Sequence, residues 1–203
     1  MKCKLEKCEN KIKTVKSMLC EKHYSRLRRT GFTDKKIPKG FEAGAVYATK
    51  NHGSLEIVSY VNSRNVIVRF IKTNHLKVSH SCSVVDGKVK DPFYPRVFGI
   101  GYNGIGEYRN SEDGKATPAY TRWKDMLRRC YCKKTKHMQS AYKDVVVCEE
   151  WHDFQNFAEW FYKNCIDGFD LDKDFLSGEN KVYSPSTCCF LSPKHNSMLR
   201  GIK

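Results

Sequence analysis

No run of about 18 apolar residues occurs in this 203-residue sequence, and acidic side chains are scarce compared with basic ones. The missing apolar run predicts a chain that does not span a membrane. Asp and Glu total 22 against 37 Lys and Arg, which leaves a formal net charge of +15. Such a chain repels itself unless it meets a polyanion, so nucleic acid is the expected partner. A merely soluble or ribosome-associated basic protein is the alternative.

The N-terminus also lacks the apolar segment of a secretory signal. Without an export signal, the ten cysteines are expected to be reduced thiols and metal ligands in a cytoplasm rather than disulfides. Hydrophobic residues make up 40% of the chain and aromatic residues 12%, which is enough for packed cores. We therefore predict an α+β protein built from several small modules.

The first residues carry four metal-binding side chains at a spacing typical of zinc sites. Four residues separate Cys3 from Cys8, and two separate Cys20 from His23. A closed set of thiolates and imidazole is the ligand set of structural Zn²⁺. Because few apolar residues lie nearby, metal binding is expected to supply the folding free energy, on the order of 10 kcal/mol. We predict a zinc-binding module over residues 1–31.

Basic side chains follow these ligands on a predicted short helix that ends near Gly31. Arg26, Arg28 and Arg29 form its cationic face. This face is a candidate contact for DNA phosphates, and a solvated basic face is the alternative.

The middle of the chain predicts a small β unit. Residues 32–44 are polar and basic and are interpreted as a linker. Four strand-like runs follow, at residues 55–60, 66–70, 76–79 and 83–85. The last run ends before Asp86-Gly87, a turn pair. These runs predict a small SH3-like sheet or barrel over residues 45–90, which serves either as a DNA clamp or as a spacer.

Residues 91–118 contain several Gly and Pro residues and are interpreted as an extended linker lying across DNA or across the next domain. Gly99, Gly101 and Gly104 fit a dinucleotide-binding pattern only loosely, and no βαβ unit follows to support it.

Residues 119–203 predict helices and then a strand–strand–helix motif. A helix over residues 119–131 is expected to bury its apolar stripe and to expose Arg122, Lys124, Arg128 and Arg129. A short strand follows at residues 145–148. A second amphipathic helix is expected to bury most of its aromatic side chains: Trp151, Phe154, Phe157, Trp160 and Phe161.

The C-terminal motif begins with a predicted strand over residues 169–174 and a turn at residues 178–180. A return strand is predicted at residues 187–191, and Ser192 is expected to cap a helix that has Pro193 at its first position. This order is that of a ββα-metal fold, which holds one divalent cation between a strand end and the helix.

The motifs together resemble phage-encoded HNH homing-type endonucleases. The family's N-terminal pattern has Leu-Cys-x-x-His-Tyr-x-Arg-x-Arg-Arg-x-Gly, and this chain has Leu19–Tyr24 followed by Arg26, Arg28, Arg29 and Gly31. The other matching positions are Val66, Val68–Phe70, Thr73, Gly87, Val89–Pro92, Gly99, Gly101, Tyr102, Tyr120, Trp123, Met126, Arg129, Cys130, Val145, Val147, Cys148, Trp151, Phe154, Phe157, Leu171–Asp174, Tyr183–Pro185, Cys188, Phe190 and Asn196.

The resemblance implies a nuclease domain at residues 119–203, with Asp172 and Asn196 as ligands of a catalytic Mg²⁺ or Mn²⁺. Water would be positioned by Lys173, Asp174 or His195. The family's general-base His is replaced here by Lys173, and its central Asn by Thr187. A Lys is a poor base because its reference pKa is about 10.4.

The expected DNA contacts are basic side chains of the two predicted helices: Arg26, Arg28, Arg29, Arg122, Arg128 and Arg129. The leading hypothesis is a metal-dependent endonuclease that cleaves duplex DNA in the cytoplasm of a bacterial host. Because of Lys173, a DNA-binding regulator with a degenerate nuclease fold is the second hypothesis. An accessory protein that binds a host enzyme is the third. Cys130, Cys148 and Cys188 either pack in the core or form a second zinc site.

Overall fold

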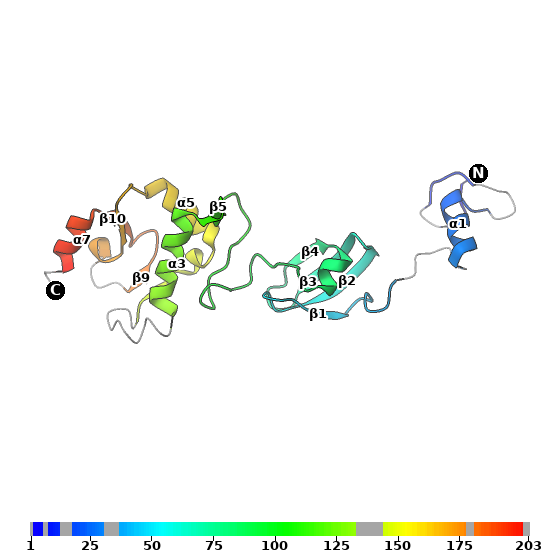
Figure 1. The fold of residues 1–203 in the computed structure, drawn as a ribbon, viewed down its shortest axis with the longest axis horizontal. Helices are drawn as coiled ribbons and strands as arrows, with labels where there is room; N and C mark the ends of the chain where they lie inside the picture. Colours follow the sequence, from blue (N-terminus) through cyan, green and yellow to red (C-terminus); the bar gives the residue numbers. More distant parts are fainter. Residues whose placement is uncertain are drawn as a thin grey trace.

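The computed structural model describes residues 2–5, 8–12, 18–30, 37–132, 144–177 and 181–200. Gly31, residues 32–36 of the expected linker and the predicted turn at residues 178–180 lie outside this part. The described residues form a mixed α+β structure whose buried apolar side chains fall into three clusters. Figure 1 shows the corresponding groups of elements in chain order. None of the described helices combines the length and the apolar character needed to cross a membrane.

The N-terminal group contains one helix, α1 (Glu21–Thr30), and an isolated antiparallel bridge between Lys2 and Lys11. Its small cluster is formed by Cys3, Leu19 and Cys20. Two of these three buried residues are predicted metal ligands, so the residues described in this group form almost no apolar core.

The second group is an antiparallel meander in which each strand pairs with the next along the chain. Its strands are β1 (Val46–Ala48), β2 (Ser54–Asn62), β3 (Asn65–Phe70) and β4 (Leu76–Ser79). Alternate residues of β2 and β3 point into one core, because successive side chains of a strand face opposite sides of the sheet. The three predicted strands over residues 55–79 are therefore confirmed.

The fourth predicted strand is wrong, because residues 83–85 belong to a short helix, α2 (Ser81–Val85). The Asp86-Gly87 pair ends this helix instead of turning a hairpin. Gly87 has a φ of +63°, and the Lys88 N–H donates to the Ser83 carbonyl at 2.8 Å. This is the Schellman arrangement, which favours Gly after a helix. Val84 lies in the sheet's core, so α2 covers one face of an open sheet, and β1 and β4 do not pair with each other.

The segment expected to be an extended linker, residues 91–118, packs onto the helices that follow it. It contains a small hairpin of β5 (Ser111–Glu112) and β6 (Lys115–Ala116), and Tyr102 forms a parallel bridge with Asp153. A Cβ added at Gly101 would lie 2.5 Å from Leu127 and 2.8 Å from Trp123. Gly101 therefore lets the backbone approach the helical core closely.

The third group is built around two helices and a large aromatic core. Its first elements are α3 (Pro118–Tyr131), β7 (Val146–Val147), the 3-10 helix η2 (Glu149–His152) and α5 (Phe154–Asn164). The predicted stripe of α3 is buried as expected: Trp123, Met126, Leu127 and Cys130. Trp151 is also buried but lies in η2 rather than in the second helix. The Trp123 indole N–H donates to the Trp151 carbonyl at 2.7 Å.

The chain ends with short strands and helices packed on this core. They are β8 (Asp170–Asp172), α6 (Asp174–Ser177), β9 (Val182–Tyr183), β10 (Cys189–Leu191) and α7 (Pro193–Arg200). β8 pairs with β10 in the antiparallel direction, β9 pairs with β7 in parallel, and α7 packs against β8. The expected strand over residues 169–174 stops at Asp172, because the chain enters α6 there.

We predict that Gly101→Ala lowers the free energy of unfolding by about 1–3 kcal/mol, because the added methyl group overpacks the contact with Trp123 and Leu127. Urea denaturation followed by tryptophan fluorescence measures the change. Thr121→Ala, at an exposed position of α3, is the control and should leave stability nearly unchanged. Equal stability of the two variants would show that the close approach at Gly101 contributes nothing.

Candidate functional site

The four N-terminal ligand residues meet in one cluster. All ligand atoms of Cys3, Cys8, Cys20 and His23 lie within 4.8 Å of one another. The Sγ atoms of Cys8 and Cys20 are 3.9 Å apart, and His23 Nδ1 is 3.5 Å from Cys3 Sγ. Ligands about 2.3 Å from a tetrahedral zinc lie about 3.8 Å from each other. The spacing thus matches a tetrahedral metal site and is far longer than the ~2.05 Å of a disulfide. The cluster can hold a metal ion such as zinc.

Hydrogen bonds favour the thiolate at Cys3. Burial acts to raise the pKa of the Cys3 thiol, but backbone hydrogen bonds at Leu5 and Cys20, with help from His23, bring the pKa down to about 6. At Cys8 the hydrogen bond from the Asn10 backbone lowers the pKa of the thiol, but burial and the neighbouring Cys20 and Cys3 outweigh it, so that this pKa is raised instead. The Asn10 side-chain amide lies 3.7 Å from Cys8 Sγ and 4.0 Å from Cys20 Sγ, as a donor to both. Sequence reasoning missed Asn10. Its place two residues after a ligand Cys is the only signal that could have indicated it.

Backbone geometry brings the two halves of the cluster together. The Cys3 N–H donates to the Asn10 carbonyl at 3.0 Å, and the Lys4 N–H donates to the Met18 carbonyl at 2.8 Å. Met18 has a φ of +53°, in the left-handed region that favours glycine. A left-handed residue here turns the chain so that Cys20 and His23 face Cys3 and Cys8.

The basic residues of α1 lie beside the metal cluster. Arg28 and Arg29 are exposed in the last turn of the helix, and Arg26 is partly buried. Basic side chains near a helix C-terminus are also favoured by the helix dipole. The structure therefore presents two of the three predicted DNA contacts to solvent.

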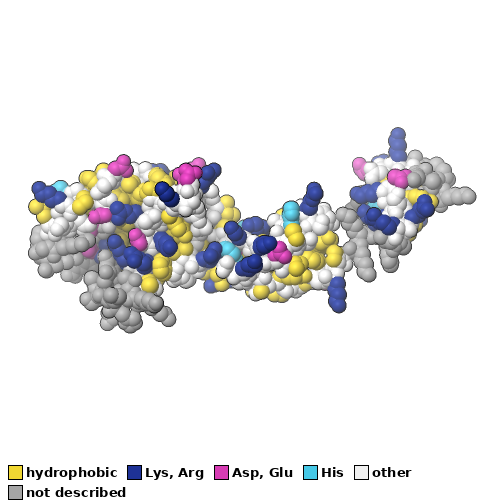
Figure 2. All heavy atoms as spheres, viewed as in Figure 1, with side chains coloured by type: hydrophobic (Ala, Val, Ile, Leu, Met, Phe, Trp, Pro, Cys, Tyr) yellow, Lys and Arg dark blue, Asp and Glu magenta, His cyan; other side chains and the backbone are white. Residues whose placement is uncertain are grey.

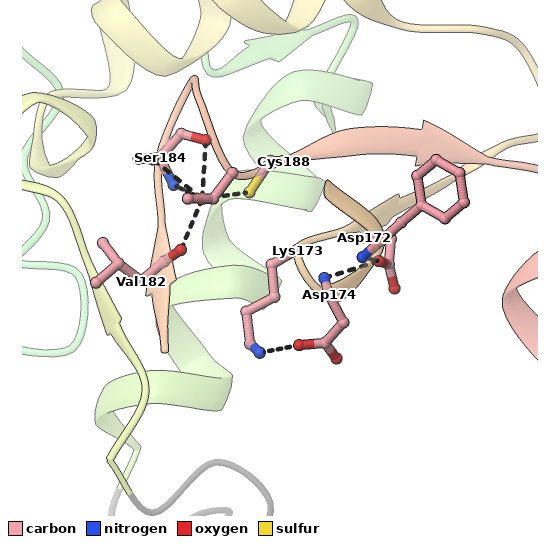
Figure 3. Close-up of polar contacts among 8 residues, drawn as sticks. Asp172, Lys173, Asp174, Val182, Ser184 and Cys188 are labelled. Atoms are coloured by element: carbon pink, nitrogen blue, oxygen red, sulfur yellow. Dashed lines mark hydrogen bonds and ion pairs between the residues drawn. The ribbon is translucent and has the colours of Figure 1, made fainter. Parts of the chain in front are cut away.

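At the other end of the chain, Asp172 is fixed by the start of α6. Its Oδ1 accepts hydrogen bonds from the backbone N–H groups of Asp174 and Phe175, both at 2.8 Å. This is the bonding of a helix N-cap. It holds the carboxylate in one orientation, and Figure 3 shows it at the end of the strand beside Lys173 and Asp174.

Lys173, one of the three residues expected to position water, is buried with its ammonium paired to the Asp174 carboxylate. Its side chain is 10% exposed, whereas that of Asp174 is 37% exposed. Figure 3 shows the Lys173 side chain extending to Asp174. A buried ammonium requires a counterion. The structure supplies Asp174 in that role, so these two residues form an ion pair rather than an acid–base pair.

His195 and Asn196 lie in the first turn of α7, as predicted. Ser192 caps this helix, because its Oγ accepts from the His195 N–H at 3.3 Å and lies 3.0 Å from His195 Nδ1. The Asn196 side chain is 8% exposed, on a helix that packs against β8, and His195 is exposed. The structure thus places Asn196 on the buried side of α7 and His195 on its solvent side.

Thr187 braces the loop before β10, where the family pattern has Asn. Its hydroxyl donates to the Val182 carbonyl at 2.7 Å and accepts from the Ser184 N–H at 3.0 Å. The bonds around Ser184 and Val182 are drawn in Figure 3. A hydroxyl donates one bond and accepts others, so Thr can replace the amide in closing this loop.

Two of the three α3 arginines form ion pairs within the protein. Arg122 pairs with Asp170 at 3.0 Å and donates to the Phe169 carbonyl at 3.3 Å, which ties α3 to β8. Arg128 pairs with Asp125 at 3.1 Å one turn away. Arg129 is partly buried. These three predicted DNA contacts therefore have structural partners or partial cover, unlike Arg28 and Arg29.

In the described ranges, only the N-terminal cluster gathers three or more His, Cys, Asp or Glu ligand atoms. Cys130, Cys148 and Cys188 do not form a second such group there; Cys130 and Cys188 are buried in the aromatic core, and Cys148 packs against it. Burial raises the pKa of the Cys188 thiol to about 12, which disfavours the thiolate that zinc binds. These cysteines are core residues.

Comparisons with known proteins give no family assignment. No family model, no curated protein and no solved structure matches this chain. Its function must therefore be argued from its own residues.

We predict that the full chain binds one zinc ion and that Cys20→Ser reduces bound zinc by at least tenfold, because a closed site loses one of its four ligands. Metal analysis of the purified protein by mass spectrometry measures the content. Cys82→Ser, at an exposed thiol outside the cluster, is the matched control and should retain full zinc. Equal zinc loss in both variants would argue against this ligand set.

Proposed function

We propose that this protein is a metal-dependent DNA endonuclease that binds duplex DNA and hydrolyses a phosphodiester bond at its C-terminal strand–strand–helix unit. The observation that supports the proposal is that Asp172 and Asn196 belong to two elements that pack against each other. Asp172 ends β8, and Asn196 lies on the buried side of α7, which packs against β8. The family resemblance assigns metal binding to these two positions.

Positive charge supports DNA as the substrate. The net charge of +15 is a property of the whole chain, and Figure 2 shows Lys and Arg side chains on all three groups of elements. Binding to phosphates would release condensed counterions and become weaker as salt rises. In this proposal Arg28 and Arg29 contact the DNA backbone, and the zinc cluster holds their helix in place.

The two oxygen ligands suit a hard cation such as Mg²⁺ or Mn²⁺. Two backbone N–H groups hold Asp172 Oδ1, which leaves Oδ2 as the oxygen available to a metal. The bound cation would stabilise negative charge on the phosphate and on the leaving 3′ oxygen. Asp172 and Asn196 would hold this cation against the DNA strand.

Of the three candidate positions for orienting water, we favour His195. The Lys173 ammonium has no lone pair, and it engages one carboxylate oxygen of Asp174. His195 is exposed, and its Nδ1 lies 3.0 Å from Ser192 Oγ, which orients the ring. Nε2 is then the ring atom that can take a proton from water.

We predict that the purified protein nicks or linearises supercoiled DNA with Mg²⁺ or Mn²⁺, and that Asp172→Asn lowers the rate at least a hundredfold. Asn keeps the oxygen that caps α6 but removes the charge that binds the cation. Gel electrophoresis measures cleavage, and fluorescence anisotropy measures DNA affinity, which should change less than threefold.

Asp167→Asn is the matched control for charge, since Asp167 is exposed and lies outside the unit. It should cleave at the wild-type rate. Equal rates for Asp172→Asn and Asp167→Asn would contradict the assignment of Asp172.

The second candidate function is DNA binding without cleavage, and the Lys173–Asp174 pair is the observation that favours it. This pair occupies the position where the family has a general base. Under this alternative, the wild-type chain binds duplex DNA in a salt-sensitive manner and leaves supercoiled DNA intact with either cation.

If the wild type cleaves, we predict that His195→Gln lowers the cleavage rate by about 10²–10⁴, the usual contribution of a general base. Gln retains a polar side chain but takes up no proton near neutral pH. Lys194→Gln, at the exposed neighbouring position, is the control and should cleave normally. An unchanged rate in His195→Gln, measured under single-turnover conditions, would remove His195 from the mechanism.

A further inference from the structure

A pocket of about 460 Å³ lies where residues 91–103 meet α3 and the loop between β1 and β2. That volume falls within the range of about 300–1,000 Å³ that is typical of small-molecule sites. None of the predicted zinc, catalytic or DNA-binding residues lines it. It is therefore a separate feature of the molecule that the nuclease proposal does not use.

Two cations line this pocket, Arg96 and Lys124. Both are exposed, and within the described part of the chain neither is paired with an acid. The charge of Arg96 affects the pKa values of two other residues in the lining, His52 and Tyr120. After burial, it is the next cause of the lowered pKa of His52, and it opposes the rise in the pKa of Tyr120 that burial produces.

The one acidic residue in the lining, Asp91, already accepts hydrogen bonds within the protein through both carboxylate oxygens. Its Oδ2 accepts from the Thr73 hydroxyl at 2.6 Å, and its Oδ1 accepts from the Phe93 N–H at 3.0 Å. Asp91 is 2% exposed. The charges that face the space of the pocket are thus mainly positive, which favours an anion.

Aromatic and amide residues complete the lining. They are Tyr94, Tyr102 and Tyr120, with Asn103 and Asn110. Aromatic faces stack with bases, and amides form hydrogen bonds with base edges.

Tyr94 is held in place by its surroundings. A Cβ at Gly53 would lie 2.9 Å from the Tyr94 ring, and the His52 ring packs edge-on against it with centroids 5.9 Å apart. The Lys72 ammonium lies 5.1 Å from the ring centroid. A ring fixed in this way loses little conformational entropy when a ligand stacks on it.

His52, in the same wall, has an unmet hydrogen bond. The residue is 8% exposed, and its Nδ1 has no partner. A buried polar atom without a partner is destabilising, so a water or ligand group that reached Nδ1 itself would be favoured.

We propose that this pocket binds one nucleoside 5′-phosphate, with the phosphate held by Arg96 and Lys124 and the base placed among Tyr94, Tyr102 and Tyr120. The proposal rests on the combination of two cations, aromatic residues and amide residues in one small pocket. The ligand is either a free nucleotide or a nucleotide unit of a DNA strand. The proposal does not depend on phosphodiester cleavage.

The test is isothermal titration of the zinc-loaded full chain with the four deoxynucleoside 5′-monophosphates, the matching nucleosides, inorganic phosphate and a single-stranded pentathymidylate. We expect at least one monophosphate or the pentanucleotide to bind at least tenfold more tightly than its nucleoside and than inorganic phosphate. Arg96→Gln should weaken that binding about tenfold or more, because it removes a charge-assisted hydrogen bond. Lys124→Gln should weaken it in the same direction.

Arg64→Gln, in the exposed turn between β2 and β3, is the matched control and should bind as the wild type does. Thermal unfolding of each variant establishes that it folds. The proposal is overturned if no nucleotide or pentanucleotide binds below millimolar concentration, if inorganic phosphate binds equally well, or if Arg96→Gln and Arg64→Gln behave alike. Loss of nucleotide binding with cleavage intact would overturn this inference alone, and nucleotide binding without cleavage would overturn only the endonuclease.

Discussion

The contact between Trp123 and Trp151 is the interaction on which the C-terminal half of the structure depends. The indole N–H of Trp123 satisfies the Trp151 carbonyl, and both rings are fully buried. On one side, Gly101 brings the pocket-lining segment directly against Trp123. On the other, Trp151 packs against Trp160 at 4.8 Å between ring centroids, and Trp160 stacks on Phe190 of β10 at 5.6 Å. One chain of aromatic contacts thus positions both the pocket and the β8–β10 pair.

The N-terminal module depends on a different constraint. In the described part of this module the buried residues are Cys3, Leu19 and Cys20, so hydrophobic burial there contributes little. The turn at Met18 and the bond from Cys3 to Asn10 bring the ligands together, but a left-handed Met is itself unfavourable. The free energy of metal binding is large enough to offset the unfavourable backbone of Met18, since structural zinc sites contribute on the order of 10 kcal/mol. The stability of α1 and of its exposed arginines should therefore follow metal content rather than core packing.

The buried faces of helices and strands and the spacing of the zinc ligands were predictable from the sequence. Close approaches between distant segments were not. The stripe on α3, the strands around Leu55 and Val68 and the zinc ligands follow from residue patterns that act locally. The helix α2 was missed because Ser-Val-Val favours a strand locally, whereas the Schellman bond to Ser83 that closes the helix depends on Gly87. The pocket was missed because its lining comes from residues as distant as His52 and Lys124. Only the tertiary packing through Gly101 brings the two ends of that lining together.

The Lys173–Asp174 pair determines how a cation would bind in the proposed catalytic unit. Because these two charges neutralise each other, Asp172 is the remaining carboxylate of this segment and Asn196 adds only a neutral oxygen. A single carboxylate binds Mg²⁺ weakly, and such sites complete the coordination with waters and substrate phosphates. Cation binding at this unit would therefore be coupled to DNA binding, with the scissile phosphate supplying the missing negative charge. The proposed endonuclease would hold its cation tightly only when the DNA strand is in place, which would confine hydrolysis to bound DNA.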